Sequence, residues 1–287
     1  MSIGKATGLG FGAILLWSML ALFTEGSRPV PPLLLNAMCF TLGGAIGLIW
    51  LFTKGDPKQL KRVPLRVYLF GTAGLFGYHF LYFSALRMAP PAQAGLIAYL
   101  WPLLIVLFSG LLPGESLRIG HVLGAVIGLS GAALILFGDG IGAIDQAALP
   151  GYGLALLCAL TWSGYSVISR RLGDTPTETV AIFCVATALL STVAHIALEP
   201  TVWPSSTRAW VSIAALGLGP VGLAFYVWDI GVKRGNIQLL GVASYAAPLL
   251  STLILVGFGV AEPTITLGLA AALITGGAIL AARASRH

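Results

Sequence analysis

The sequence carries little charge for its length. Only 9% of the 287 residues are Asp, Glu, Lys or Arg, whereas 57% are apolar, and the mean hydropathy is +0.92. A water-soluble domain has about a quarter charged residues. The scarcity of charge therefore excludes an ordinary soluble protein and predicts an all-α membrane protein.

Cysteine is also scarce, and Cys39, Cys158 and Cys184 all fall inside apolar segments. Their spacing fits neither a metal site nor a disulfide framework, so we interpret them as small buried apolar residues. The sequence lacks a metal-spaced set of histidines and carboxylates, a serine-nucleophile motif in context and a phosphate-binding glycine loop with its lysine. We expect no enzyme activity, no metal and no cofactor, and a channel or membrane enzyme is the remote alternative.

Apolar stretches recur along the whole chain, each long enough to cross a hydrocarbon core of about 30 Å as a helix. We expect ten transmembrane helices, at residues 6–24, 32–53, 65–88, 92–112, 118–138, 150–169, 179–198, 209–231, 237–259 and 264–282. The first could be mistaken for a signal peptide because Lys5 precedes its apolar run. However, Glu25, Arg28 and three prolines follow where a cleavage site requires small residues.

The net charge of +6 does not indicate nucleic-acid binding, because the basic residues concentrate in the predicted loops. With ten crossings, three of them lie on one side of the membrane: Arg28, Arg87 and Arg208. Thirteen lie on the other side with both termini: Lys5, Lys54, Lys58, Lys61, Arg62, Arg66, Arg118, Arg170, Arg171, Lys233, Arg234, Arg283 and Arg286. By the positive-inside rule, both termini are cytoplasmic.

The second half of the sequence repeats features of the first at a nearly constant offset. Six matches are 146 positions apart: Gly71 with Gly217, Arg87 with Lys233, Gly95 with Gly241, Tyr99 with Tyr245, Pro102 with Pro248, and Gly131 with Gly277. Trp17 matches Trp162 at 145, and Glu115 matches Glu262 at 147. Because five crossings are an odd number, the copy enters the membrane from the opposite face. We predict two inverted five-helix repeats, residues 1–140 and 150–287, which together form one transport domain working by alternating access.

These features resemble the drug/metabolite transporter superfamily, specifically its EamA-type exporters. Halves of that family carry a tryptophan in the first helix, a proline followed by apolar residues in the fourth, and an acidic residue before the fifth. The matching features here are Trp17 and Trp162, the segments 99–104 and 245–250, and Glu115 with Glu262. The resemblance covers essentially the whole chain and implies a multi-pass exporter of the bacterial inner membrane.

Aromatic residues well inside the predicted spans are the candidate substrate site. Tyr78 and Tyr82 lie four residues apart and so share a helix face. The full set is Trp17, Tyr78, Tyr82, Tyr99, Trp101 and Trp162, with His79, Trp228 and Tyr245 as second-tier candidates. The alternative is that these rings only pack the bundle or face lipid, although the repeat favours a shared cavity for Trp17 and Trp162. Pro102 and Pro248 each remove a backbone donor and are possible hinges.

Charged residues within the spans are few, which restricts the substrate. Asp229 is either functional or, as we favour, paired with Lys233 at an i, i+4 spacing. His79 either titrates in a proton-coupled cycle or is a hydrogen-bonded structural residue. No lysine or arginine lies deep in a span, so an anionic substrate would find no counter-charge.

A neutral aromatic site fits neutral, especially aromatic, amino acids, whose ammonium group can lie over a ring face. The alternative substrate class is organic cations and other small amphiphiles. We expect the lipid bilayer and the small-molecule substrate to be the partners, no nucleic acid to bind, and the monomer to function alone.

Overall fold

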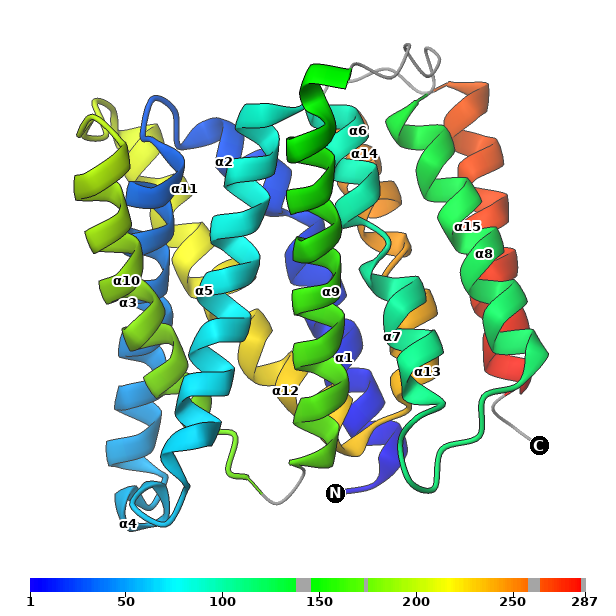
Figure 1. Ribbon diagram of the computed structural model, residues 1–287, viewed down its shortest axis with the longest axis horizontal. Helices are drawn as coiled ribbons and strands as arrows, with labels where there is room; N and C mark the ends of the chain where they lie inside the picture. Colours follow the sequence, from blue (N-terminus) through cyan, green and yellow to red (C-terminus); the bar gives the residue numbers. More distant parts are fainter. Residues whose placement is uncertain (138–145, 173–174, 258–263, 285–287) are drawn as a thin grey trace.

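The computed structural model describes residues 1–137, 146–172, 175–257 and 264–284. Within these ranges the chain forms helices joined by loops, without any strand. The helices run mostly side by side, and α1 (Ile3–Ser18) begins at the same end of the bundle at which α15 (Ile265–Ala284) ends (Figure 1). The predicted all-α class is confirmed.

Most of the other helices lie over the predicted spans, and the short helices at 57–60 and 146–148 lie in the predicted loops. In the first half they are α2 (Leu20–Gly26), α3 (Pro32–Thr53), α4 (Pro57–Leu60), α5 (Leu65–Met88), α6 (Pro91–Ala98), α7 (Trp101–Ser109) and α8 (Ile119–Leu136). In the second half they are η1 (Gln146–Ala148), α9 (Leu149–Arg171), α10 (Thr179–Leu198), α11 (Thr207–Leu218), η2 (Gly219–Leu223), α12 (Ala224–Arg234), α13 (Ile237–Ala243) and α14 (Ala246–Gly257).

Several of these segments can cross a membrane. Among the described residues, six are long and apolar enough: Ile3–Gly26, Pro32–Thr53, Gln146–Arg171, Thr207–Arg234, Thr179–Leu198 and Ile265–Ala284. The bent pair α13 and α14 brings the number to seven if it forms one span. A multi-pass chain is therefore confirmed, whereas ten crossings, the inverted repeat and the position of the termini stay predictions.

The main helix pairs join the two halves of the chain. Helix α1 packs against α12, α3 against α10, α5 against α9 and α8 against α15. Two of these pairs depend on glycine: a Cβ on Gly231 would lie 2.7 Å from the Cα of Gly10, and one on Gly124 would lie 2.6 Å from the carbonyl oxygen of Gly277. Small residues let membrane helices approach this closely without a loss of packing.

Both predicted hinge prolines follow a break in a helix. Helix α6 ends at Ala98, four residues before Pro102, and α13 ends just before Ser244, four residues before Pro248. A proline ring clashes with the carbonyl four residues earlier, which explains why both breaks lie there. The α13–α14 pair is bent by 40°. Thus neither proline lies in a straight, regular helix.

A third break, at Pro220, was not predicted. The predicted span 209–231 was expected to be one helix, but the corresponding segment contains the π-helical turn η2 around this proline. A π turn inside an α-helix often lies at a functional position. Here the carbonyl oxygen of Pro220 accepts a hydrogen bond of 3.1 Å from Nε1 of Trp17.

The three cysteines are buried and free. This confirms their interpretation as small buried apolar residues. Glu262, which the repeat pairs with Glu115, lies outside the described residues.

Candidate functional site

Four tryptophans from four different helices meet in the middle of the bundle. The ring of Trp17 on α1 lies 6.1 Å from Trp101 on α7, 5.8 Å from Trp162 on α9 and 5.0 Å from Trp228 on α12. Most of these pairs are edge-to-face or tilted, which are favourable arrangements for aromatic quadrupoles. The sequence prediction that Trp17, Trp101 and Trp162 act together is consistent with this cluster, which we call the tryptophan cluster.

Two indole groups of the cluster are fixed by hydrogen bonds. Trp17 donates to Pro220, as described above, and Nε1 of Trp228 donates to Oγ of Ser166 at 3.1 Å. Trp228 is fully buried, whereas Trp17 is half-buried. Buried indole N–H groups need such partners. Trp228, a second-tier candidate, is therefore a fully enclosed member of the cluster, whereas Trp17 keeps part of its surface exposed.

The tyrosines of α5 extend the cluster on one side. Tyr78 and Tyr82 are stacked at 6.1 Å with nearly parallel rings, as their spacing predicted. Tyr78 also lies 5.2 Å from Trp162. Both tyrosines are half-buried. Together they form an aromatic wall that continues from the tryptophan cluster along α5.

Tyr99 lies near Tyr78 and Tyr82, and it also packs against a second apolar cluster. That cluster contains its repeat partner Tyr245, with Val106 and Leu249. The hydroxyl of Tyr245 accepts a 3.0 Å hydrogen bond from the backbone N–H of Leu103, which the break before Pro102 leaves without its usual partner. Tyr245 therefore has a structural role at this break, because neighbouring helices must satisfy backbone groups that a proline frees in a membrane.

His79 is held among rings. Its Nδ1 lies 2.7 Å from the carbonyl oxygen of Leu75, which can only accept, so Nδ1 carries the proton. The imidazole lies 5.0 Å from Phe40 and 5.9 Å from Phe225, both with edge-to-face geometry. This environment favours the structural interpretation of His79 over the proton-coupling one.

Asp229 and Lys233 form the predicted ion pair. Oδ1 of Asp229 and Nζ of Lys233 are 2.9 Å apart, and both side chains are almost fully buried. Thr177 donates a 2.8 Å hydrogen bond to the other oxygen of Asp229, and Nζ of Lys233 donates to the carbonyl oxygen of Thr175 at 3.0 Å. The preferred interpretation of Asp229 is confirmed.

Two further acidic residues, the buried Glu199 and the partly buried Glu115, each connect helices at one end of the bundle. Glu199, at the end of α10, pairs with Arg87 of α5 and accepts hydrogen bonds from the backbone N–H groups of Leu33 and Leu34 at the start of α3. His195 lies 3.0 Å from the same carboxylate.

At the opposite end, Glu115 pairs with Arg170 of α9. Its second oxygen accepts a 2.9 Å hydrogen bond from Gln238. Arg170 also donates to the carbonyl oxygens of Val232 and Gly235, and it thereby caps the C-terminal end of α12. Glu115 is the acidic residue before the fifth helix that the family resemblance identified. Through Arg170 and Gln238 it connects its own segment in the first half to α9 and α13 in the second half.

Comparison with known proteins adds the family. The EamA-like transporter family matches twice, over residues 5–137 and 149–283. The chain belongs to the EamA-like transporter family. The aromatic amino acid exporter YddG of Ancylobacter novellus is 56% identical over 289 residues, with 100% of both chains covered. Its namesake from Salmonella typhimurium is 29% identical, with 88% of each chain covered. A solved crystal structure is 55% identical, covers 99% of both chains and has a TM-score of 0.93.

This EamA-like transporter is a multi-pass protein of the bacterial inner membrane and not an enzyme, as the sequence indicated. Trp203 and Trp210 lie outside the tryptophan cluster and are largely exposed.

Sequence reasoning missed two rings in the centre of this EamA-like transporter. Phe225 lies 6.4 Å from Trp17 and 5.8 Å from Trp162, and it stacks on Phe40 at 5.4 Å. The available signal was that Phe225 precedes Trp228 by three residues on α12, which places the two side chains on neighbouring positions of one face.

Proposed function

We propose that this protein exports neutral, especially aromatic, amino acids across the bacterial inner membrane. The observation that carries the proposal is the tryptophan cluster, to which helices of both halves contribute. Relatives named as aromatic amino acid exporters support it, one of them at 56% identity over the full length. Six residues form the proposed substrate site: Trp17, Tyr78, Tyr82, Tyr99, Trp101 and Trp162.

The chemistry of the cluster suits a ligand with an aromatic side chain. The half-buried faces of Trp17, Tyr78 and Tyr82 offer apolar area and ring quadrupoles, so an aromatic side chain can pack edge-to-face against them. The ammonium group of the ligand gains from a ring face within about 6 Å. Because the indole N–H of Trp17 is already bonded to Pro220, we expect tyrosine hydroxyls to meet the polar head of the ligand.

Alternating access by two inverted repeats, residues 1–140 and 150–287, is the proposed mechanism. Exchanging the halves would convert the α1·α12 pair into the α9·α5 pair, and both pairs are extensive in the structure. The α3·α10 and α8·α15 pairs map onto themselves. This pairing pattern supports two five-helix repeats, and the excess of basic residues in one set of loops supports cytoplasmic termini. We expect a complete path within one chain and therefore a functional monomer.

The helix breaks provide places where the halves can bend. Pro102, Pro248 and Pro220 each follow or lie in an irregular turn at mid-segment, next to aromatic residues of the site. Discontinuous helices near the membrane midplane are typical of transporter binding sites. We therefore propose all three breaks as hinges.

Organic cations are a less suitable substrate class. Among the described residues, the buried carboxylates of Asp229 and Glu199 are each paired with a cation of the protein itself. A cationic ligand would have to compete with these partners, whereas a zwitterion brings a charge of each sign.

The test is uptake of labelled phenylalanine, tryptophan and threonine into proteoliposomes that contain only this protein. We expect saturable uptake by the wild type and a reduction of about tenfold or more in Trp17→Ala and Trp162→Ala, because each loses ring contacts worth more than about 1.4 kcal/mol. The matched control is Trp203→Ala, whose side chain is 61% exposed, which should transport normally. Absence of uptake of all three amino acids by folded wild-type protein would refute the proposal.

A further inference from the structure

Positive charge is concentrated in the loop between α3 and α5, which includes the short helix α4, and in the first turn of α5. Residues 54–66 contain five basic side chains and one acidic one. All five basic residues are exposed. Figure 1 shows α4 at the end of the bundle at which the chain begins, which the proposed topology puts in the cytoplasm. We call the five residues the basic loop cluster: Lys54, Lys58, Lys61, Arg62 and Arg66.

No carboxylate of the described residues forms an ion pair with this cluster. At the same end of the bundle, by contrast, Arg170 and Lys233 each pair with a carboxylate. The one acidic residue of the segment is Asp56, and its carboxylate accepts a 2.9 Å hydrogen bond from the backbone N–H of Lys58, which caps α4. The five positive charges are therefore available to an anion from outside the protein.

The backbone that carries the cluster is held in place. The hydroxyl of Tyr68 on α5 donates a 2.8 Å hydrogen bond to the carbonyl oxygen of Leu60. The backbone N–H of Val63 bonds to the same carbonyl at 3.1 Å, which continues the turn of α4, and the Val63 side chain packs against the main core. A loop that is already ordered loses little further entropy when it binds a ligand. Three members of the cluster lie on this turn at spacings of three and four residues: Lys58, Lys61 and Arg62.

The cluster borders surface that faces lipid. Phe52, two residues before Lys54 at the end of α3, is 71% exposed, and Leu65, next to Arg66 at the start of α5, is 70% exposed. Both lie at ends of predicted spans. At a rise of about 1.5 Å per residue, the neighbouring cations lie within one turn of the hydrocarbon boundary. Long basic side chains at this depth place their charge among the headgroups of the lipids.

We propose that the basic loop cluster is a binding site for anionic phospholipids of the inner leaflet, such as phosphatidylglycerol. The phosphate of the headgroup would pair with the cations of the α4 turn, and the acyl chains would lie along the exposed apolar side chains of α3 and α5. A zwitterionic phospholipid also brings a cation, which the cluster repels. The inference goes beyond the proposed function, because it depends on no transported substrate and assumes only the proposed orientation in the membrane.

The positive-inside rule explains the sign of this loop but not its density of charge. Orientation depends on the count of basic residues over all short inner loops, and the other inner loops, 113–118, 170–178 and 233–236, contain one or two basic residues each. The matching outer segment of the second half, 200–212, contains one, Arg208. Clusters of about four to eight Lys or Arg directly beside a span are typical of segments that bind acidic headgroups. The concentration of five cations in one loop therefore favours a lipid site.

Native mass spectrometry of the protein in detergent measures the preference directly. The protein is mixed with equal amounts of phosphatidylglycerol and phosphatidylcholine that carry identical acyl chains, and the bound lipids are counted. We expect the wild type to prefer phosphatidylglycerol at least about tenfold, because each cation near an anionic headgroup strengthens binding about fivefold. In Lys58→Gln/Lys61→Gln/Arg62→Gln the preference should fall to about threefold or less, since only two cations of the cluster remain.

The matched control is Lys5→Gln/Arg171→Gln/Arg234→Gln. It removes three exposed cations from the same side of the proposed topology, so the net charge changes equally, but it leaves the basic loop cluster intact. We expect it to keep the preference of the wild type. An equal loss of preference in the control would assign the effect to net charge and overturn the site.

The wild type alone provides a second test, which needs no variant. Raising the ammonium acetate concentration from about 0.1 M to about 1 M shortens the screening length from about 10 Å to about 3 Å. Because the cations are exposed, the preference for phosphatidylglycerol should fall severalfold. A preference that does not respond to salt, or equal binding of the two lipids, would refute the proposal.

Inorganic phosphate distinguishes a lipid site from a site for free anions. Added in excess and compared with chloride at equal ionic strength, it should not displace phosphatidylglycerol, because it lacks acyl chains that bind apolar surface. Displacement by phosphate would reassign the cluster to a soluble anion and overturn the lipid site. None of these outcomes depends on transport: a protein that prefers phosphatidylglycerol but does not transport phenylalanine would refute only the proposed function.

Discussion

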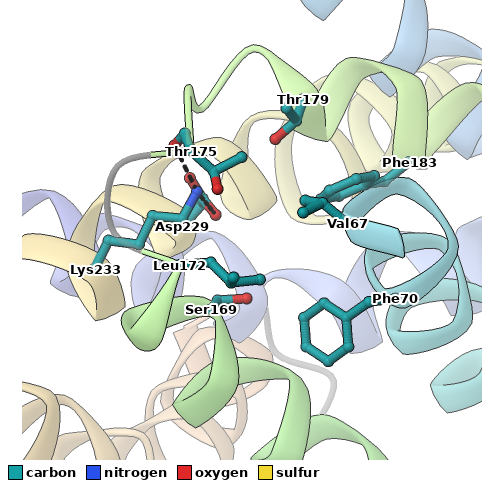
Figure 2. A pocket seen from close by; sticks show the side chains of 9 residues that line it. All are labelled: Val67, Phe70, Ser169, Leu172, Thr175, Thr179, Phe183, Asp229 and Lys233. Atoms are coloured by element: carbon teal, nitrogen blue, oxygen red, sulfur yellow. Dashed lines mark hydrogen bonds and ion pairs between the residues drawn. The ribbon is translucent and has the colours of Figure 1, made fainter. Parts of the chain in front are cut away.

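Arg87 and Lys233 occupy matching positions of the two halves, yet their surroundings differ. Arg87 is 45% exposed and reaches across to Glu199 on another helix, whereas Lys233 is 4% exposed and pairs with Asp229 of its own helix. The first pair fastens three helices at the outer end of the proposed topology. The second pair joins two positions of α12 at the other end and lies beside a narrow recess (Figure 2). The repeat thus preserves the position of the cation, whereas its partner lies on another helix in one half and on the same helix in the other.

The largest effect is expected when the outer fastening loses its carboxylate. Glu199→Ala removes the acceptor of two backbone N–H groups of α3 and of the His195 imidazole, and it leaves Arg87 without its partner. We expect a loss of about 4 kcal/mol in the free energy of unfolding, measured by denaturant unfolding in detergent micelles. A loss under about 1 kcal/mol would show that Glu199 does not hold these helices together.

A smaller loss is expected at the other end. Lys233→Met leaves Asp229 buried with Thr177 as its remaining described donor, and we expect a loss of about 3 kcal/mol. Adding Asp229→Asn removes the unpaired charge and should restore most of that stability, since replacing a buried pair by neutral residues is often nearly neutral. Without such a rescue, the Asp229–Lys233 pair would stabilise the packing of helices as Glu199 does, and the two ends of the bundle would not differ in this respect.

The smallest effect is expected for the exposed cation. Arg87→Ala removes only a half-exposed partner, and the Glu199 carboxylate keeps its hydrogen bonds to Leu33, Leu34 and His195. We expect a loss of about 1 kcal/mol. The double variant with Glu199→Ala measures the coupling energy between the two residues. A loss for Arg87→Ala as large as that for Glu199→Ala would show that the ion pair, and not the hydrogen bonds to the start of α3, stabilises this end of the bundle.

Local sequence patterns predicted the helices well, because hydropathy and length determine which segments can cross a membrane. The repeat singled out Trp17 and Trp162, which meet in the structure, and the i, i+4 spacing identified the Asp229–Lys233 pair. Both signals depend on periodicity within a helix or on a duplication, which a single sequence preserves.

Contacts between distant segments could not be predicted in the same way. Nothing local indicates that Glu199 binds the start of α3, that Tyr245 serves the break before Pro102, or that Phe225 stacks on Phe40. The π turn at Pro220 was missed for a related reason: a proline in an apolar run indicates a bend but not which carbonyl is freed or which side chain satisfies it.

The most direct test of the central claim is to locate a bound substrate in a crystal of the protein grown with 4-bromo-L-phenylalanine, using the anomalous signal of bromine. We expect a bromine peak against the rings of Trp17, Tyr78 and Trp162. Transport of this compound, together with a peak only at positions remote from the tryptophan cluster, would contradict the proposed substrate site.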